Sequence, residues 1–176
     1  GIVNGTTNYI LTKMAEEGMD FAEALAKATE LGYAEADPTA DIEGFDACRK
    51  ICILASLAFG KHVFPESVYT EGITKITLED VEYARSWGGV IKLIGRCKVE
   101  DDGRMDIGVA PMFVPSKSQL ANINGQMKYY DKVMGNTTVQ RVGNALKGIA
   151  ATTGLTSTSQ SPAETENITV PSASPA

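Results

Sequence analysis

The sequence predicts an α+β fold with a mixed, largely antiparallel sheet and helices packed on one face. Two observations favour this class. The first sixty residues place apolar side chains at the three- and four-residue spacing of helices with one buried face. Residues 90–99 and 105–114 are strand-like apolar runs on either side of an Asp-Asp-Gly turn, which is typical of a β-hairpin.

Two helices are expected in the first 32 residues. Thr6 or Thr7 would cap the first, which ends at Gly18. Asp20 would cap the second, which ends at Gly32. Both helices lead into an acidic loop.

A third, more apolar helix is expected from Pro38 to Gly60. Pro38 suits the first turn of a helix, and Thr39 or Asp41 would cap it. Gly44 would then lie inside the helix at a cost of up to about 1 kcal/mol relative to alanine, which indicates a close approach to the backbone there.

The remaining elements complete the sheet. Residues 68–73 are expected to form a strand, and Thr77 opens a capping box for a helix that reaches Gly88. The hairpin follows, with Lys92 and Lys98 facing solvent. Three aromatic side chains are candidates for stacking on a nicotinamide, but the favoured interpretation places them in the core: Tyr83, Trp87 and Phe113.

Residues 32–50 (GYAEADPTADIEGFDACRK) hold five carboxylates in nineteen residues and end in a lysine. Such a density of mutually repelling charges indicates a site for a small cationic or amine-bearing substrate. Asp46 and Lys50 are four residues apart, so their side chains share one helix face. Two interpretations are open. The residues form an ordinary surface ion pair, or the carboxylate of Asp46 tunes Lys50 for proton transfer.

This segment resembles the signature of homoserine dehydrogenases: Gly-Tyr, then Asp-Pro-x-x-Asp, then Gly-x-Asp with a lysine four residues later. Residues 1–11 (GIVNGTTNYIL) resemble the start of the substrate domain in the same family. The resemblance is strongest over residues 1–127 and weakens from residue 128.

The resemblance implies the interconversion of L-aspartate 4-semialdehyde and L-homoserine with NADP or NAD as cofactor, in threonine, methionine and isoleucine biosynthesis. It implies Lys50 as the acid/base residue and Asp46 as the residue that positions it. The implied substrate contacts are Glu35 at the amino group, Asp41 near the reacting hydroxyl, and Gly5, Thr6 and Tyr33 as pocket lining. It also implies a homodimer, for which the other face or an edge of the sheet is the candidate surface.

The domain expected from these observations spans residues 1–150, followed by a disordered Ser/Thr/Pro-rich tail at 151–176. In the family a nucleotide-binding domain precedes the substrate domain. The chain has no G-x-G-x-x-G segment in a βαβ context, so the cofactor would be bound mainly by that absent domain. A non-catalytic dimerisation or amino-acid-binding module is the alternative.

The amino-acid composition limits the classes of partner and site that are expected. The net charge of −6 argues against nucleic acid, and no apolar run suggests a membrane span or signal peptide, so a cytoplasmic protein is expected. Three cysteines and one histidine favour reduced core thiols over a disulfide framework or a metal site.

Overall fold

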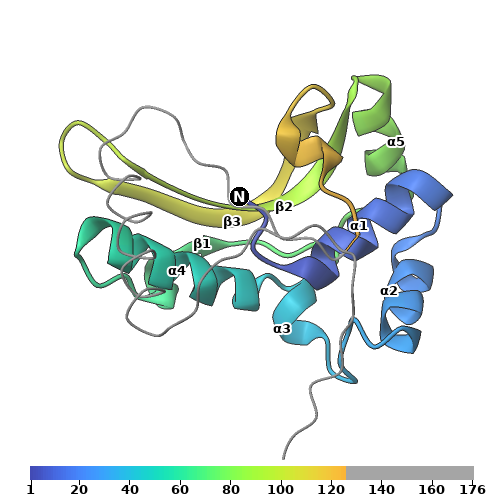
Figure 1. Ribbon diagram of the computed structural model, residues 1–176, viewed down its shortest axis with the longest axis horizontal. Coiled ribbons are helices and arrows are strands. Elements are labelled where there is room, and N and C mark those ends of the chain that lie inside the picture. The colour runs from blue at the N-terminus through green and yellow to red at the C-terminus, as the bar shows by residue number, and fades with distance from the viewer. Residues whose placement is uncertain (126–176) are drawn as a thin grey trace, which may run out of the picture.

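The computed structural model describes residues 1–125, which form an α+β fold as predicted (Figure 1). The predicted 151–176 tail and the departure from the family after residue 127 lie outside the described residues. The α-helices are α1 (Gly5–Glu17), α2 (Phe21–Glu30), α3 (Thr39–Ile42), α4 (Phe45–Phe59) and α5 (Leu78–Ser86). The strands are β1 (Tyr69–Thr70), β2 (Gly89–Val99) and β3 (Met105–Pro115), and two 3₁₀ turns are η1 (Pro65–Ser67) and η2 (Gln119–Asn122).

The described sheet has the order β1-β3-β2 and is mixed and largely antiparallel, as predicted. Strands β2 and β3 pair antiparallel along their whole length, from Gly89 opposite Pro115 to Val99 opposite Met105. β1 pairs parallel to β3 over two residues only. The expected strand at 68–73 is therefore shorter than predicted, because the chain leaves the sheet to bond α3: the Ile73 amide donates to the Ile42 carbonyl at 2.7 Å.

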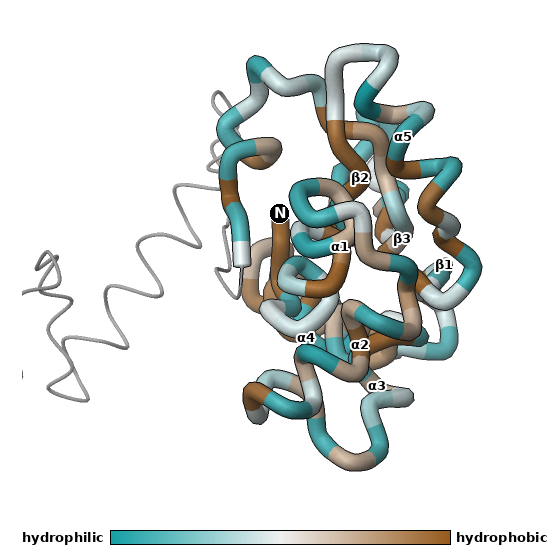
Figure 2. The backbone as a smooth tube through the Cα atoms, turned by 90° about the vertical axis from the view of Figure 1, so that its right-hand side faces the viewer, coloured by the Kyte–Doolittle hydropathy of each residue, from teal (hydrophilic) through white to brown (hydrophobic). Residues whose placement is uncertain are grey.

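The main core lies between the sheet and the helices. Helix α4 packs against β2 and β3, and α1 packs against β2. Figure 1 shows α3 and α4 on one side of the hairpin and η2 on the other, and Figure 2 shows hydrophobic stretches in α1 and β2. The cluster includes Ile10, Met14, Ile51, Leu93 and Val109.

A smaller apolar cluster forms on the opposite face of the hairpin. Ile94 follows Leu93 in β2 and so points to the other face, where it packs with Val114, Ile2 and Ala121. The start of the chain is fixed to this region, because Gly1 and Gly95 exchange two backbone hydrogen bonds of 2.6 and 3.0 Å.

Two of the four predicted N-caps are confirmed and two are wrong. Asp20 forms a capping box with Glu23, and Thr77 forms one with Asp80. Helix α1 is capped by Asn4 and not by Thr6 or Thr7, since the Asn4 side chain accepts a hydrogen bond from the Thr7 amide. The helix thus begins earlier than predicted. Neither Thr39 nor Asp41 is an N-cap, because both lie inside α3, which begins after Pro38 and has no side-chain cap.

The prediction of a single helix from Pro38 to Gly60 is wrong. The chain forms two helices, α3 and α4, and Gly44 caps α4 at φ +82° instead of lying inside a helix. The reason is the close approach of residues 70–73: a Cβ on Gly44 would lie 3.2 Å from the Glu71 carbonyl oxygen. The break makes Asp46 a first-turn residue of α4.

Two expectations about side-chain exposure are also wrong. Lys92 does not face solvent, because only 2% of it is exposed, whereas Lys98 is exposed as predicted. The aromatic side chains expected in the core are instead exposed: Tyr83, Trp87 and Phe113. Tyr83 and Trp87 pack on each other at 5.4 Å between ring centroids at the end of α5, outside the core.

Candidate active site

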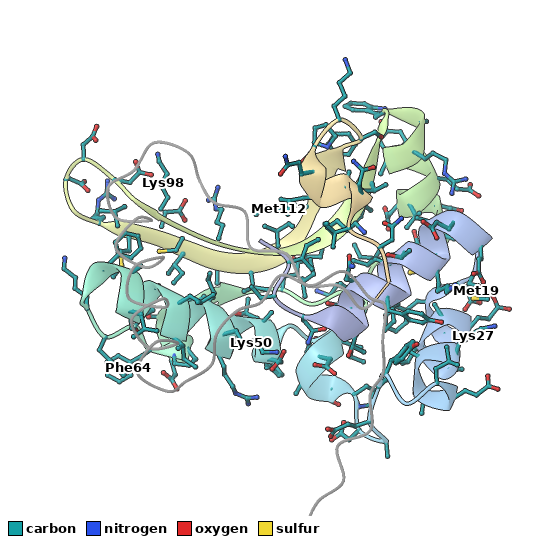
Figure 3. The ribbon with its side chains drawn as sticks, viewed as in Figure 1. Met19, Lys27, Lys50, Phe64, Lys98 and Met112 are labelled. Atoms are coloured by element: carbon teal, nitrogen blue, oxygen red, sulfur yellow. The ribbon has the colours of Figure 1, made fainter. Side chains whose placement is uncertain are left out.

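A chain of hydrogen bonds joins four polar side chains where α1, α3 and α4 meet. The Asn4 amide nitrogen donates to Asp41 Oδ1 at 2.6 Å and to Asp46 Oδ2 at 2.8 Å. The Lys50 ammonium donates to the same Asp46 oxygen. Figure 3 labels Lys50 on α4, near the start of α1 and beside α3. Three of the predicted site residues, Asp41, Asp46 and Lys50, are therefore brought together.

The Lys50–Asp46 pair is half-buried. The exposed fractions of the two side chains are 35% and 29%, so the pair is partly shielded while the ammonium can still reach a bound molecule. A freely exposed pair at this spacing stabilises a helix by only about 0.3–0.5 kcal/mol. Here Asn4 also holds the carboxylate, which makes the pair part of a fixed network rather than an isolated surface contact.

Helix ends moderate the repulsion among the acids of this region. Asp46 lies in the first turn of α4, and Asn4 directly precedes α1. The positive end of a helix dipole favours a nearby carboxylate, by about 0.3–1 kcal/mol when exposed. The first turn of α4, the Asn4 amide and the Lys50 ammonium thus offset the charge of Asp46.

Gly5, Thr6 and Tyr33 form a second group beside this network. Gly5 and Thr6 are buried in the first turn of α1. The Thr6 hydroxyl donates to the Tyr33 carbonyl at 2.8 Å, and the Tyr33 ring packs edge-on against Tyr9 with 4.9 Å between centroids. These contacts fasten the loop after α2 to the start of α1.

Glu35 lies on that same loop and is exposed. Within residues 1–125 it makes no hydrogen bond to the other predicted site residues. It follows Tyr33 by two residues on the loop that Thr6 anchors. Its charge is accessible to an incoming ammonium group.

Asn4 is the member of this hydrogen-bonded network that the sequence did not reveal. In the sequence it appeared only as part of the matched segment 1–11. An asparagine directly before a helix is a favoured N-cap, and that pattern could have identified its side chain as fixed. Its amide nitrogen additionally bridges two carboxylates, which depends on contacts 37 and 42 residues away.

Lys92 of β2 is buried against α1, away from the Lys50 network. Its ammonium donates to Asn8 Oδ1 at 3.0 Å, to the Thr12 hydroxyl at 3.4 Å and to the Ile123 carbonyl at 2.7 Å. Asn8 also donates to the Ile123 and Gly125 carbonyls. Burial lowers the pKa of Lys92 to about 8, with Glu16 opposing the shift.

Cys48 and Cys52 are buried, as predicted, whereas Cys97 is only partly buried. Burial together with the neighbouring Cys48 raises the pKa of Cys52 in α4 to about 11. A thiol with a raised pKa is a poor nucleophile at neutral pH. Cys52 therefore serves packing in the main core.

No cluster of three or more His, Cys, Asp or Glu side chains is arranged to hold a metal ion among residues 1–125. No helix formed by the same residues is both long and apolar enough to cross a bilayer.

Comparison with known proteins shows the family. The sequence model for homoserine dehydrogenase matches residues 1–157. The homoserine dehydrogenase of Mycobacterium tuberculosis is 53% identical over 129 residues, which cover 71% of this chain and 29% of that protein. The Pseudomonas aeruginosa homoserine dehydrogenase is 49% identical over 127 residues, covering 72% of this chain and 29% of that protein.

Solved structures agree with the sequence relatives. The crystal structure of Staphylococcus aureus homoserine dehydrogenase at pH 6.5 matches with a TM-score of 0.71 and 36% identity, over 85% of this chain and 41% of that one. The homoserine dehydrogenase of Thiobacillus denitrificans matches with a TM-score of 0.69 and 38% identity, over 86% of this chain and 39% of that one. The chain spans about 29% of the length of the first two sequence relatives. Because the family model covers most of its length and relatives near half-identical share its segments, this chain belongs to the homoserine dehydrogenase family.

Proposed function

We propose that this chain is the substrate-binding and catalytic part of an enzyme that interconverts L-aspartate 4-semialdehyde and L-homoserine with NADPH or NADH. The observation that supports this most directly is the hydrogen-bonded chain from Asp41 through Asn4 and Asp46 to Lys50. It places a partly exposed ammonium beside a carboxylate that is itself held in place.

Lys50 is the proposed acid/base residue. In the direction of reduction, a nicotinamide cofactor held by another part of the protein would supply the hydride. The aldehyde oxygen gains negative charge as the hydride arrives, and the Lys50 ammonium stabilises that charge and donates the proton that completes the alcohol. In the opposite direction the neutral amine accepts the hydroxyl proton. Asp46 holds the Lys50 side chain in the required position.

The acidic residues suit the amino acid part of the substrate. We assign the substrate ammonium to Glu35, whose carboxylate is exposed on the anchored loop. Asp41 is assigned to the reacting hydroxyl, since Asn4 links it to Asp46. The residues assigned to the pocket lining are Gly5, Thr6 and Tyr33.

The nicotinamide cofactor is assigned to another part of the protein. Residues 1–125 hold β1 as a two-residue parallel strand and a β2–β3 hairpin, and no glycine-rich loop joins a strand to a helix in this region. Such a loop is what binds the pyrophosphate in dinucleotide-binding folds. The residues described here therefore do not fit the dinucleotide by themselves.

We further infer a cytoplasmic homodimer that serves threonine, methionine and isoleucine biosynthesis, with residues 1–150 as one domain. The dimer is supported by aromatic side chains exposed around Gly89: Tyr83, Trp87 and Phe113. Aromatic residues are enriched at protein interfaces. The alternative of a non-catalytic module is not favoured, because the matched relatives are named as dehydrogenases.

A segment exchange tests the proposed activity. The matching segment of the Pseudomonas aeruginosa homoserine dehydrogenase is replaced by the aligned segment of this chain, and oxidation of L-homoserine is followed by NADPH or NADH absorbance. The proposal predicts a turnover that Lys50→Met removes. A folded chimera without turnover would contradict it.

A further inference from the structure

Asn4 uses all of its side-chain hydrogen-bonding capacity at the candidate active site. Its amide hydrogens go to two different carboxylates, Asp41 and Asp46, at 2.6 and 2.8 Å. Its oxygen accepts from the Thr7 amide at 2.8 Å and the Thr7 hydroxyl at 2.9 Å. The residue is only 4% exposed. An amide bonded on both sides and buried to this extent has a single orientation.

This orientation serves two helices at once. The oxygen caps α1, and the nitrogen faces the first turn of α4 and the short helix α3. Two carboxylates brought this close repel each other unless donors lie between them. Asn4 donates a hydrogen bond to both carboxylates and so offsets their repulsion. Because its amide is neutral, it adds no positive charge that would repel the Lys50 ammonium.

We propose that Asn4 is a positioning residue for proton transfer: by binding Asp46 Oδ2 and Asp41 Oδ1, it fixes the carboxylate that holds Lys50 and keeps Asp41 at the same site. This inference rests on the proposed function. Asn4 acts through Asp46 and needs no contact with the substrate.

Two substitutions separate this role from helix capping. Serine and aspartate are both good N-caps, so Asn4→Ser and Asn4→Asp preserve the start of α1. Both lose the amide hydrogens that bridge the carboxylates. Asn4→Asp additionally places a third carboxylate against the other two. Asp20→Asn exchanges the same two residue types at the N-cap of α2, away from the site, and is the matched control.

The experiment measures kcat, KM and the pH–rate profile of the chimera described above. Asn4→Ser is expected to lower kcat by roughly tenfold or more while KM for L-homoserine changes less, because a positioned acid/base group contributes 10²- to 10⁴-fold. In the direction of aldehyde reduction, Asn4→Asp is expected to move the alkaline limb of the profile to higher pH, since the added carboxylate favours the protonated ammonium. Asp20→Asn is expected to match the unsubstituted chimera in all three quantities.

The outcomes separate the two proposals. An active chimera whose kcat and pH profile are unchanged by both Asn4 substitutions overturns the role of Asn4 and leaves the proposed function standing. A folded but inactive chimera overturns the proposed function and this inference with it. Thermal melts by circular dichroism check that the variants fold. If Asn4→Asp unfolds the protein, the kcat-to-KM comparison of Asn4→Ser decides the question.

Discussion

Asn4 and Lys50 donate hydrogen bonds to the same atom, Oδ2 of Asp46. One donor comes from the residue before α1 and the other from the second turn of α4, so a single carboxylate oxygen joins the two helices. The Lys50 ammonium is thereby fixed relative to α1, whose first turn carries Gly5 and Thr6. The shared oxygen therefore sets the position of the proposed acid/base group, Lys50, relative to the proposed pocket lining, Gly5 and Thr6.

Glu35→Gln is expected to weaken substrate binding more than catalysis. The exposed carboxylate is assigned to the substrate ammonium, and the neutral amide keeps the shape but loses the charge. KM for L-homoserine should rise by roughly tenfold to a hundredfold, given that hydrogen bonds to charged groups contribute about 1.5–3 kcal/mol. Steady-state kinetics of the chimera measure this. Glu30→Gln, at the end of α2, is the control, and an unchanged KM in Glu35→Gln would show that Glu35 does not bind the substrate.

Gly44→Ala is expected to destabilise the fold more than Gly60→Ala. Both glycines have a positive φ, which costs a residue with a Cβ about 1–2 kcal/mol. At Gly44 the new Cβ would also lie 3.2 Å from the Glu71 carbonyl oxygen, whereas at Gly60 it meets nothing within 4 Å. Urea unfolding compares the two variants. Equal losses would mean that the approach of residues 70–73 does not require glycine.

Lys92→Met is expected to change how stability depends on pH. The pKa of Lys92 is lowered from 10.5 to about 8, so the unfolded chain binds this proton more tightly than the folded chain. Unfolding therefore takes up a proton between about pH 8 and 10.5, and the free energy of unfolding rises with pH across that range, by up to roughly 3 kcal/mol.

Urea unfolding at pH 7.5, 9 and 10.5 tests this by difference. The free energy of unfolding of the unsubstituted chain minus that of Lys92→Met should increase with pH. Lys98→Met is the control, because Lys98 lies on the same strand and is exposed. A difference that stays constant with pH would show that Lys92 titrates alike in the folded and unfolded chains.

Tyr9→Phe is expected to stabilise the chain. Tyr9 is 5% exposed, and its hydroxyl has no hydrogen-bond partner within residues 1–125. Removing a buried hydroxyl that lacks a partner recovers a desolvation cost of about 1 kcal/mol or more. The Tyr69 hydroxyl donates to Glu71 at 2.7 Å at the surface, so Tyr69→Phe should not stabilise the chain. A loss of stability in Tyr9→Phe would contradict this prediction.

Local chemistry was predictable from the sequence. The capping boxes at Asp20 and Thr77 involve residues three apart, and the hairpin turn near Gly103 needs only its own residues. The i,i+4 pair of Asp46 and Lys50 belongs to the same class, since a continuous helix brings the two side chains together.

Features that depend on distant contacts were not predictable. The break at Gly44 is imposed by residues 70–73, which pack on it from another part of the chain. Lys92 is buried because Asn8 and Thr12, more than 75 residues earlier, supply oxygen atoms for its ammonium. The alternation of side chains along a strand predicts the face of the sheet on which a residue lies. It does not predict whether another element supplies a hydrogen-bond partner on that face. The bridging role of Asn4 escaped prediction for the same reason.

The turnover of Lys50→Met in the chimera tests the central claim most directly. Methionine keeps much of the side-chain volume but removes the ammonium that Asp46 holds. If Lys50 transfers the proton, kcat should fall by about 10²-fold or more with a smaller change in KM, and Arg49→Met on the exposed face of α4 should leave both unchanged. A folded Lys50→Met chimera that keeps the kcat of the unsubstituted chimera would contradict the assignment of Lys50 as the acid/base residue.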